Sequence, residues 1–167
     1  QTELKIVQTE LDGVLQARLP TLADLRVLPA TTAAVEEALR LFPPAYSLFL
    51  RQATEDVAIS GTHVRKGDNV QIVPFTLHRD PRWYETPEAF MPSRFRQPPT
   101  WPQYAYLPFG AGPRVCVGQN FALMEACLAA ATILQRWAPE QISTLPIPSA
   151  KFSLRPRGGL SMTWRRR

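Results

Sequence analysis

Proline is the feature that most limits what this chain can fold into. The sequence holds 17 prolines in 167 residues, and many of them lie between residues 81 and 113. A proline fixes φ and lacks a backbone N–H, so it interrupts helices and strands. We therefore expect residues 81–113 to be ordered coil with short turns, placed between regular elements on either side.

Stretches of helical periodicity lie on both sides of this coil. Within them, apolar residues recur every three or four positions, as on the buried face of a helix. One stretch, "TTAAVEEALRLFPP", is rich in strong helix formers and ends at the proline pair Pro43-Pro44. The expected helices cover residues 1–18, 21–29, 31–44 and 118–137.

Short strands account for much of the remainder. Between the third helix and the coil, alternating or apolar runs are separated by glycine turns, which predicts a small sheet of hairpins. The expected strands lie within residues 46–54, 57–61, 62–68 and 69–75. A terminal hairpin over residues 151–165 would turn at Gly158-Gly159. The predicted fold is therefore mainly α with small β-sheets (α+β), and residues 1–167 are within the size of one domain.

Charge and hydropathy exclude two classes of partner. The net charge is +5 and the chain ends in Arg165–Arg167, but basic residues and aromatic residues are not interleaved in any stretch, so we expect no nucleic acid partner. The longest apolar run, Ala126–Leu134, is far shorter than the roughly 20 residues of a membrane span. We expect no membrane segment in this chain, and the sequence leaves open an anchor upstream of residue 1.

The two cysteines are expected to be free thiols. If a helix joins Cys116 to Cys127, eleven residues separate them by about 16 Å, and a disulfide tolerates about 7 Å between α-carbons. Free thiols are typical of a reducing compartment, and no secretory signal opens the chain, so we expect a cytoplasmic location. The alanine, arginine and proline content is typical of a bacterial protein.

One cysteine lies in a glycine-spaced loop, "FGAGPRVCVGQNFAL". Val115 breaks the phosphate-binding pattern GxGxxG, and the histidines and cysteines lack the spacing of a zinc site. Cys116 instead precedes a long helix, whose N-terminal dipole together with Arg114 favours a thiolate. Gly112 and Gly118 leave the backbone bare for a large flat group. The residues alone leave three possibilities: a metal-bound thiolate, a buried cysteine in a tight turn, and a nucleophile paired with His78.

The spacing of this loop resembles that of a known family. Its residues spell FxxGxRxCxG through Phe109, Gly112, Arg114, Cys116 and Gly118. That pattern resembles the haem-binding loop of the cytochrome P-450 superfamily, the haem-thiolate monooxygenases. The resemblance implies that Cys116 is the axial iron ligand of haem b. It also implies that Phe109 packs beside the sulfur and that Arg114 contacts a haem propionate.

Other segments resemble the same family in the expected order. Glu37 and Arg40 form an ExxR pattern, and "FMPSRF" is similar to the family's PERF segment, with Arg94 matching and Ser93 in place of glutamate. The resemblance implies that Glu37, Arg40 and Arg94 form a structural cluster that holds the coil before the cysteine loop. It also implies that Arg51 is a second propionate contact, although a strand arginine usually faces solvent.

The remaining chemical side chains are expected to be ordinary. His63 is expected in a hairpin turn without a role, and His78 in a surface position or turn, with a propionate contact as its alternative. Cys127 lies in an alanine- and leucine-rich helix and is expected to be a packed core thiol.

The resemblance implies an oxygenase and its usual partners. The expected reaction inserts one oxygen atom of O2 into a small apolar substrate, with electrons from a ferredoxin or a flavoprotein reductase. The chain resembles the C-terminal portion of such an enzyme and lacks the helix that carries the oxygen-activating residues. Two alternatives therefore stay open: haem-thiolate isomerase, dehydratase or peroxygenase chemistry, and a non-catalytic haem-binding fragment.

Overall fold

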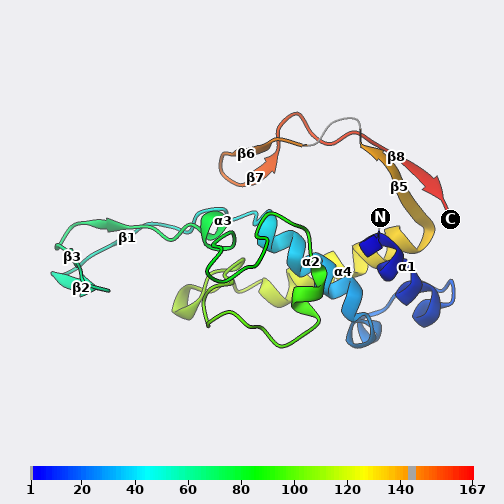
Figure 1. The fold of residues 1–167 in the computed structure, drawn as a ribbon, viewed down its shortest axis with the longest axis horizontal. Helices are drawn as coiled ribbons and strands as arrows, with labels where there is room; N and C mark the ends of the chain where they lie inside the picture. The colour runs from blue at the N-terminus through cyan, green and yellow to red at the C-terminus, as the bar shows by residue number, and fades with distance from the viewer. Residues whose placement is uncertain (1, 143–145) are drawn as a thin grey trace.

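A computed structural model of the chain describes residues 2–142 and 146–167. Three longer helices, two-stranded antiparallel ribbons and a long coil make up the structure (Figure 1), which confirms the α+β prediction. The longer helices are α1 (Thr2–Leu15), α2 (Pro29–Leu41) and α4 (Gln119–Arg136). Short helical turns are η1 (Leu22–Val27), α3 (Pro74–Leu77), η2 (Pro92–Phe95) and η3 (Gly112–Arg114).

The helices pack into one apolar core, formed by α1, α2, α4 and the turn before α2. Its buried members are those that the helical spacing brings to one face of each helix. They are Val7, Leu11, Leu15, Leu28, Ala30 and Ala131.

A carboxylate joins α1 to the start of α2. Glu10 Oε1 accepts the N–H of Ala30 at 2.6 Å, and Glu10 Oε2 accepts the N–H of Thr31 at 2.9 Å and its hydroxyl at 2.8 Å. The first N–H groups of a helix lack partners within the helix, and its N-terminus attracts negative charge. Glu10 therefore caps α2 from a neighbouring helix.

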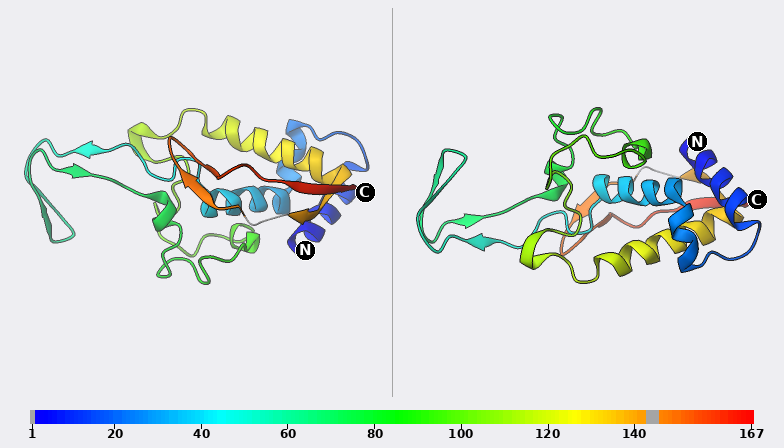
Figure 2. Two further views of the ribbon diagram at one scale, coloured as in Figure 1. Left: turned by 90° about the horizontal axis from the view of Figure 1, so that it is seen from above. Right: turned by 90° about the horizontal axis from the view of Figure 1, so that it is seen from below.

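The proline-rich region is coil with short turns, as the sequence predicts. Between α3 and η3 the structure contains only η2, single turns and bends. Two of the shorter strand pairs extend from the helical body as a long arm (Figure 1, Figure 2). In this arm β1 (Arg51–Gln52) pairs with β4 (Asn69–Val70), and β2 (Val57–Ile59) pairs with β3 (Thr62–Val64).

The predicted terminal hairpin over residues 151–165 is wrong. The strand β7 (Leu154–Pro156) pairs with the strand before it, β6 (Pro148–Ala150), and β8 (Met162–Arg166) pairs with β5 (Trp137–Ile142). Gly158 and Gly159 do adopt positive φ, at 74° and 84°. These two glycines turn the chain away from β7, whose pairing with β6 ends at Pro156. The chain then runs beside β5, the longer strand that directly follows α4.

Candidate functional site

The cysteine loop is a chain of tight turns at the head of α4. The N–H of Cys116 donates to Phe109 O at 2.9 Å, and the N–H of Val115 donates to Gly112 O at 3.0 Å. Gly110 and Gly112 have φ of +73° and +68°, a region that side chains disfavour, so the turns depend on these glycines. This fold of the backbone leaves the side chain of Cys116 exposed.

The surroundings of the sulfur are open and apolar. Val117 is fully exposed, and Val115 and Phe121 are also exposed. A β-carbon at residue 118 would lie 3.9 Å from Cys116 Sγ, so Gly118 leaves that side of the sulfur uncovered. Gly118 has an ordinary φ of −87°, so the turn does not require a glycine at this position. The absence of a side chain at residue 118 matters because it leaves the sulfur accessible.

The structure gathers most predicted ligand residues into this loop, whereas Arg51 lies on another element. Arg114 ends η3 and is exposed, and Phe109 is half-buried at the start of the loop. Arg51 is exposed on β1. Within the described part of the chain, no ion pair includes Arg51 or Arg114.

These residues fit a haem held through sulfur. An exposed thiol, an open backbone at Gly112 and exposed apolar side chains suit the face of a flat apolar ring. The unpaired guanidinium groups of Arg51 and Arg114 have the charge that two ring carboxylates need.

A buried ion pair lies beneath the coil that leads into the loop. The side chains of Glu37 and Arg40 are both 0% exposed, and they meet through two hydrogen bonds, Nε to Oε2 at 2.6 Å and Nη2 to Oε1 at 2.9 Å. Arg94 Nε lies 3.5 Å from Glu37 Oε1, which also accepts the N–H of Met91 at 2.7 Å. Two arginines thus share one carboxylate.

Backbone carbonyls of the coil satisfy the surplus positive charge. Arg40 donates to the carbonyls of His78 and Pro87, each at 2.7 Å, and of Ala89 at 3.1 Å. Arg94 donates to the carbonyls of residues 85 and 86. A proline-rich coil has few N–H groups for such carbonyls, so the two guanidinium groups supply the donors that the coil lacks.

His78 is buried, and the expected surface position is wrong. Its Nε2 accepts the N–H of Leu107 at 2.7 Å, so its Nδ1 carries the proton and donates to Arg40 O at 3.2 Å. Both ring nitrogens are therefore occupied, which excludes a propionate contact from His78 in this arrangement. Desolvation by burial lowers the pKa of His78 to about 4, so the ring is neutral.

Sequence reasoning missed the tyrosines that hold the same coil. Tyr84 is fully buried and donates its hydroxyl to Ala105 O at 3.0 Å, and Tyr106 donates to Glu36 O at 3.0 Å. Burial raises the pKa of both tyrosines above the ordinary value. The sequence did contain a signal for this role, which is the high number of aromatic residues within the predicted coil. Such large apolar side chains are usually buried, so they indicate a packed coil.

Cys127 is buried, as predicted, and both cysteines are free. Its thiol lies 3.8 Å from Thr32 Oγ1, and burial raises the pKa of Cys127. Among the described residues no three side chains of His, Cys, Asp or Glu form a cluster that could hold a metal ion. Within the same residues, no helix combines the length and the apolar character that crossing a membrane requires.

Comparison with known proteins identifies the family. The sequence model of the cytochrome P450 family matches residues 4–161, so the chain belongs to the cytochrome P450 family. Proteins of this family carry haem and are, as a class, monooxygenase oxidoreductases.

Individual relatives are similar along almost the whole chain. It is 42% identical over 161 residues to the protein named "Putative cytochrome P450 132" of Mycobacterium tuberculosis, and the aligned region covers 95% of this chain and 35% of that protein. It is 40% identical over 159 residues to cyclooctatin synthase of Streptomyces melanosporofaciens, with 94% and 33% covered. It is 38% identical over 175 residues to cytochrome P450 4V2 of Homo sapiens, with 98% and 32% covered. The chain thus spans about a third of the length of these relatives.

Proposed function

We propose that this chain is the haem-binding portion of a haem-thiolate monooxygenase, with the thiolate of Cys116 as the axial ligand of haem b. One observation carries the proposal: in a member of the cytochrome P450 family, the exposed cysteine follows two turns with positive φ at the head of α4. A haem bound through a thiolate supplies the chemistry, reductive activation of O2 and insertion of one oxygen atom into a C–H bond.

The chain's own residues bind and orient. Gly110, Gly112 and Gly118 shape a loop whose backbone admits a flat ring close to the sulfur. Arg114 and Arg51 would bind the two propionates, since a guanidinium pairs with a carboxylate through a fork of N–H donors.

The remaining partners follow from the same proposal. The substrate is a small apolar molecule, and the electrons come from a ferredoxin or a flavoprotein reductase. The exposed apolar side chains of Leu50 and Phe49 support an apolar substrate. The bacterial relatives support a bacterial setting, and a cytoplasmic location stays a prediction.

Haem titration of the 167-residue chain tests the axial ligand. The purified chain is titrated with haemin, reduced and exposed to carbon monoxide, and the Soret band is recorded. We expect a thiolate-type shift that disappears in Cys116→Ser and persists in Cys127→Ser, the matched control at the other cysteine. Far-ultraviolet circular dichroism shows whether each variant folds like the wild type.

Two results contradict the proposal. In one, the Cys116→Ser variant still binds haem and its Soret band is unchanged from that of the wild type. In the other, the wild-type chain shows no thiolate-type shift. If haem binds as expected but no electron donor or peroxide supports turnover, the chain is instead a non-catalytic haem-binding fragment.

A further inference from the structure

His78 exchanges two hydrogen bonds with the last turn of α2. Its ring donates from Nδ1 to Arg40 O at 3.2 Å, and the Arg40 guanidinium donates back to His78 O at 2.7 Å. The two residues are 38 positions apart in the sequence, and both are fully buried. The side chain and the main chain of His78 are thus both held by a residue of the buried ion pair.

The other ring nitrogen holds the last stretch of coil before the cysteine loop. His78 Nε2 accepts the N–H of Leu107 at 2.7 Å. The neighbouring Tyr106 places its ring centroid 5.2 Å from that of His78, and its hydroxyl donates to Glu36 O on α2 at 3.0 Å. A ring contact and two hydrogen bonds therefore tie residues 106 and 107 to α2, directly or through His78.

From Leu107 the hydrogen bonds continue into the loop itself. Leu107 O accepts the N–H of Gly110 at 3.2 Å, and Phe109 O accepts the N–H of Cys116 at 2.9 Å. At its other end the loop passes into α4, where the N–H of Gln119 donates to Cys116 O at 3.2 Å. The loop is thus supported at two ends, by Leu107 and by the head of α4.

The support at Leu107 matters because burial holds little of the loop. Leu107 is the last buried residue before the loop, and the next along the chain is Cys127. None of residues 108–126 is buried, all of them within the described range 2–142. A segment with few buried contacts opens at a low free energy, so the place of this loop depends on the residues that anchor its ends.

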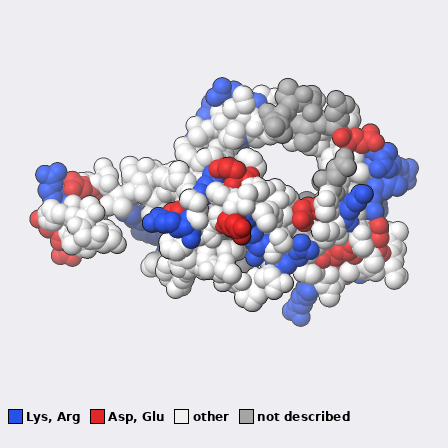
Figure 3. All heavy atoms as spheres, viewed as in Figure 1, with Lys and Arg blue, Asp and Glu red and all other residues white. Residues whose placement is uncertain are grey.

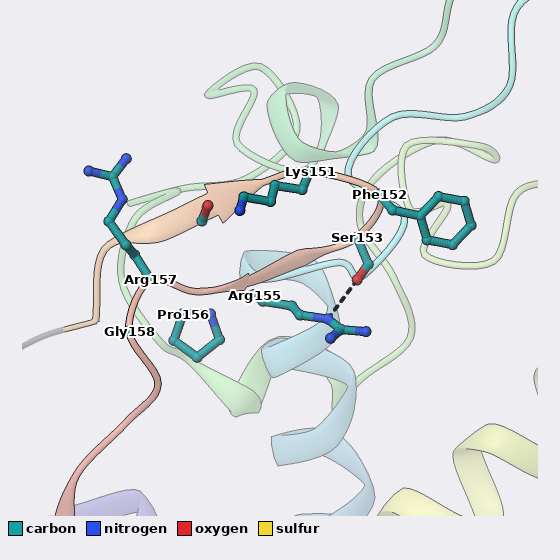
Figure 4. Close-up of a pocket in the computed structure, with 8 residues that line it drawn as sticks. Lys151, Phe152, Ser153, Arg155, Pro156, Arg157 and Gly158 are labelled. Atoms are coloured by element: carbon teal, nitrogen blue, oxygen red, sulfur yellow. Dashed lines mark hydrogen bonds between the residues drawn. The ribbon is translucent and has the colours of Figure 1, made fainter.

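Two other polar side chains show how unusual the contacts of His78 are. His63 lies on the arm, 3.8 Å from Asp56 and with a 63% exposed side chain, and the tip of the arm carries side chains of both charges (Figure 3). Arg155 donates from Nε to Ser153 Oγ at 3.0 Å within the β6–β7 hairpin (Figure 4). Each of these contacts stays within one hairpin, whereas the ring of His78 joins segments that are distant in the sequence.

We propose that His78 is a positioning residue for the cysteine loop. The acceptor Nε2 of its neutral ring fixes Leu107, and Leu107 fixes the start of the loop relative to α2. A neutral imidazole suits this role because it carries one donor and one acceptor on a rigid ring. That the loop presents an axial thiolate rests on the proposed function, whereas its placement by His78 does not require haem.

Nitrogen NMR on the haem-free 167-residue chain tests the state of the ring. The sequence has two histidines, so with isotope-labelled histidine the variant His63→Asn leaves only the signals of His78. Near neutral pH we expect a protonated Nδ1 and an unprotonated Nε2. A ring protonated on Nε2 is unable to accept the N–H of Leu107, so that result would overturn the proposal.

Two conservative substitutions separate the roles of the two ring nitrogens. His78→Asn keeps a donor near the place of Nδ1 but is too short to reach Leu107, whereas His78→Gln places an amide oxygen near Nε2 that accepts the same N–H. Amide hydrogen exchange on the haem-free chain measures the result. We expect exchange at Leu107, Gly110 and Cys116 to be about tenfold faster in His78→Asn, because a buried donor then lacks its partner. In His78→Gln it should stay near the wild-type rate.

Two controls separate a local role from a general loss of stability. His63→Asn makes the same change at the other histidine, and Arg155→Ala removes a single hydrogen bond elsewhere. Neither should alter exchange in the loop. Equal exchange rates in His78→Asn and His78→Gln would refute the role of Nε2. An acceleration in His78→Asn that is as large in α1 as in the loop would show a general loss of stability instead.

The haem-loaded chain gives a second, spectroscopic readout. We expect the share of the carbon monoxide complex with a thiolate-type Soret band to fall in His78→Asn and to be restored in His78→Gln. Equal shares in both variants would contradict the proposal. If the wild-type chain shows no thiolate-type band, the proposed function fails, and the exchange rates still decide the role of His78. If the exchange rates do not separate the two variants, the role of His78 fails and haem ligation by Cys116 stands.

Discussion

Replacing Glu37 with glutamine tests how much the buried charge cluster stabilises the fold. Glu37 Oε1 accepts from Arg40 and Met91, and Oε2 accepts from Arg40. Arg94 Nε lies 3.5 Å from Oε1, so these neighbours all present N–H groups to the carboxylate. An amide in its place must turn its own N–H2 group toward one of these donors. The substitution also leaves the fully buried Arg40 guanidinium without a counter-charge.

We expect Glu37→Gln to lower the free energy of unfolding by about 3–5 kcal/mol, the cost of breaking a buried pair on one side. With an m-value of about 2 kcal/mol/M, the urea midpoint followed by circular dichroism falls by about 2 M. The matched control is Glu140→Gln, whose partner Arg165 lies 3.0 Å away, with the two side chains 50% and 62% exposed. An exposed pair contributes less than about 1 kcal/mol, so equal losses in the two variants would refute the reasoning.

Three further predictions concern capping, pH and thiol access. Glu10→Gln removes the carboxylate that caps α2, and we expect urea unfolding to show a loss of about 1 kcal/mol. Burial lowers the pKa of His78 from 6.5 to about 4. As the pH falls, His78 is therefore protonated in the unfolded chain before it is protonated in the folded chain. The free energy of unfolding should therefore decrease by up to about 3 kcal/mol between pH 6.5 and pH 4, and His78→Gln should remove that part of the pH dependence. A disulfide reagent should modify the exposed Cys116 rapidly and the buried Cys127 only on unfolding; two fast thiols would contradict the packing of α4.

Local signals explain what the sequence predicted well. Helical periodicity and the proline pair after α2 depend on neighbouring residues alone, and the structure has helices where these signals lie. The same holds for the coil, since each proline acts on its own backbone. The loop motif is also local, because its glycines take their φ values within a few residues of Cys116.

Non-local contacts explain what the sequence could not predict. His78 is buried because its ring joins Arg40 O to the N–H of Leu107, two groups that are distant in the sequence. The strand β8 pairs with β5, although Gly158-Gly159 would equally suit a local hairpin. A two-glycine turn specifies that the chain reverses, but it does not specify which strand lies beside the returning segment.

The charge cluster shows why the serine at position 93 does not disturb the arrangement. Ser93 is exposed on η2, whereas the guanidinium of Arg94 turns inward toward Glu37 and the carbonyls of residues 85 and 86. The negative charge of this cluster comes from Glu37 on α2. Because position 93 is exposed, a carboxylate there would face solvent. The donors of Arg40 and Arg94, together with the acceptor nitrogen of the His78 ring, hold the coil from residue 78 to Leu107. That coil ends two residues before Phe109, so the position of the cysteine loop depends on a cluster that never touches the sulfur.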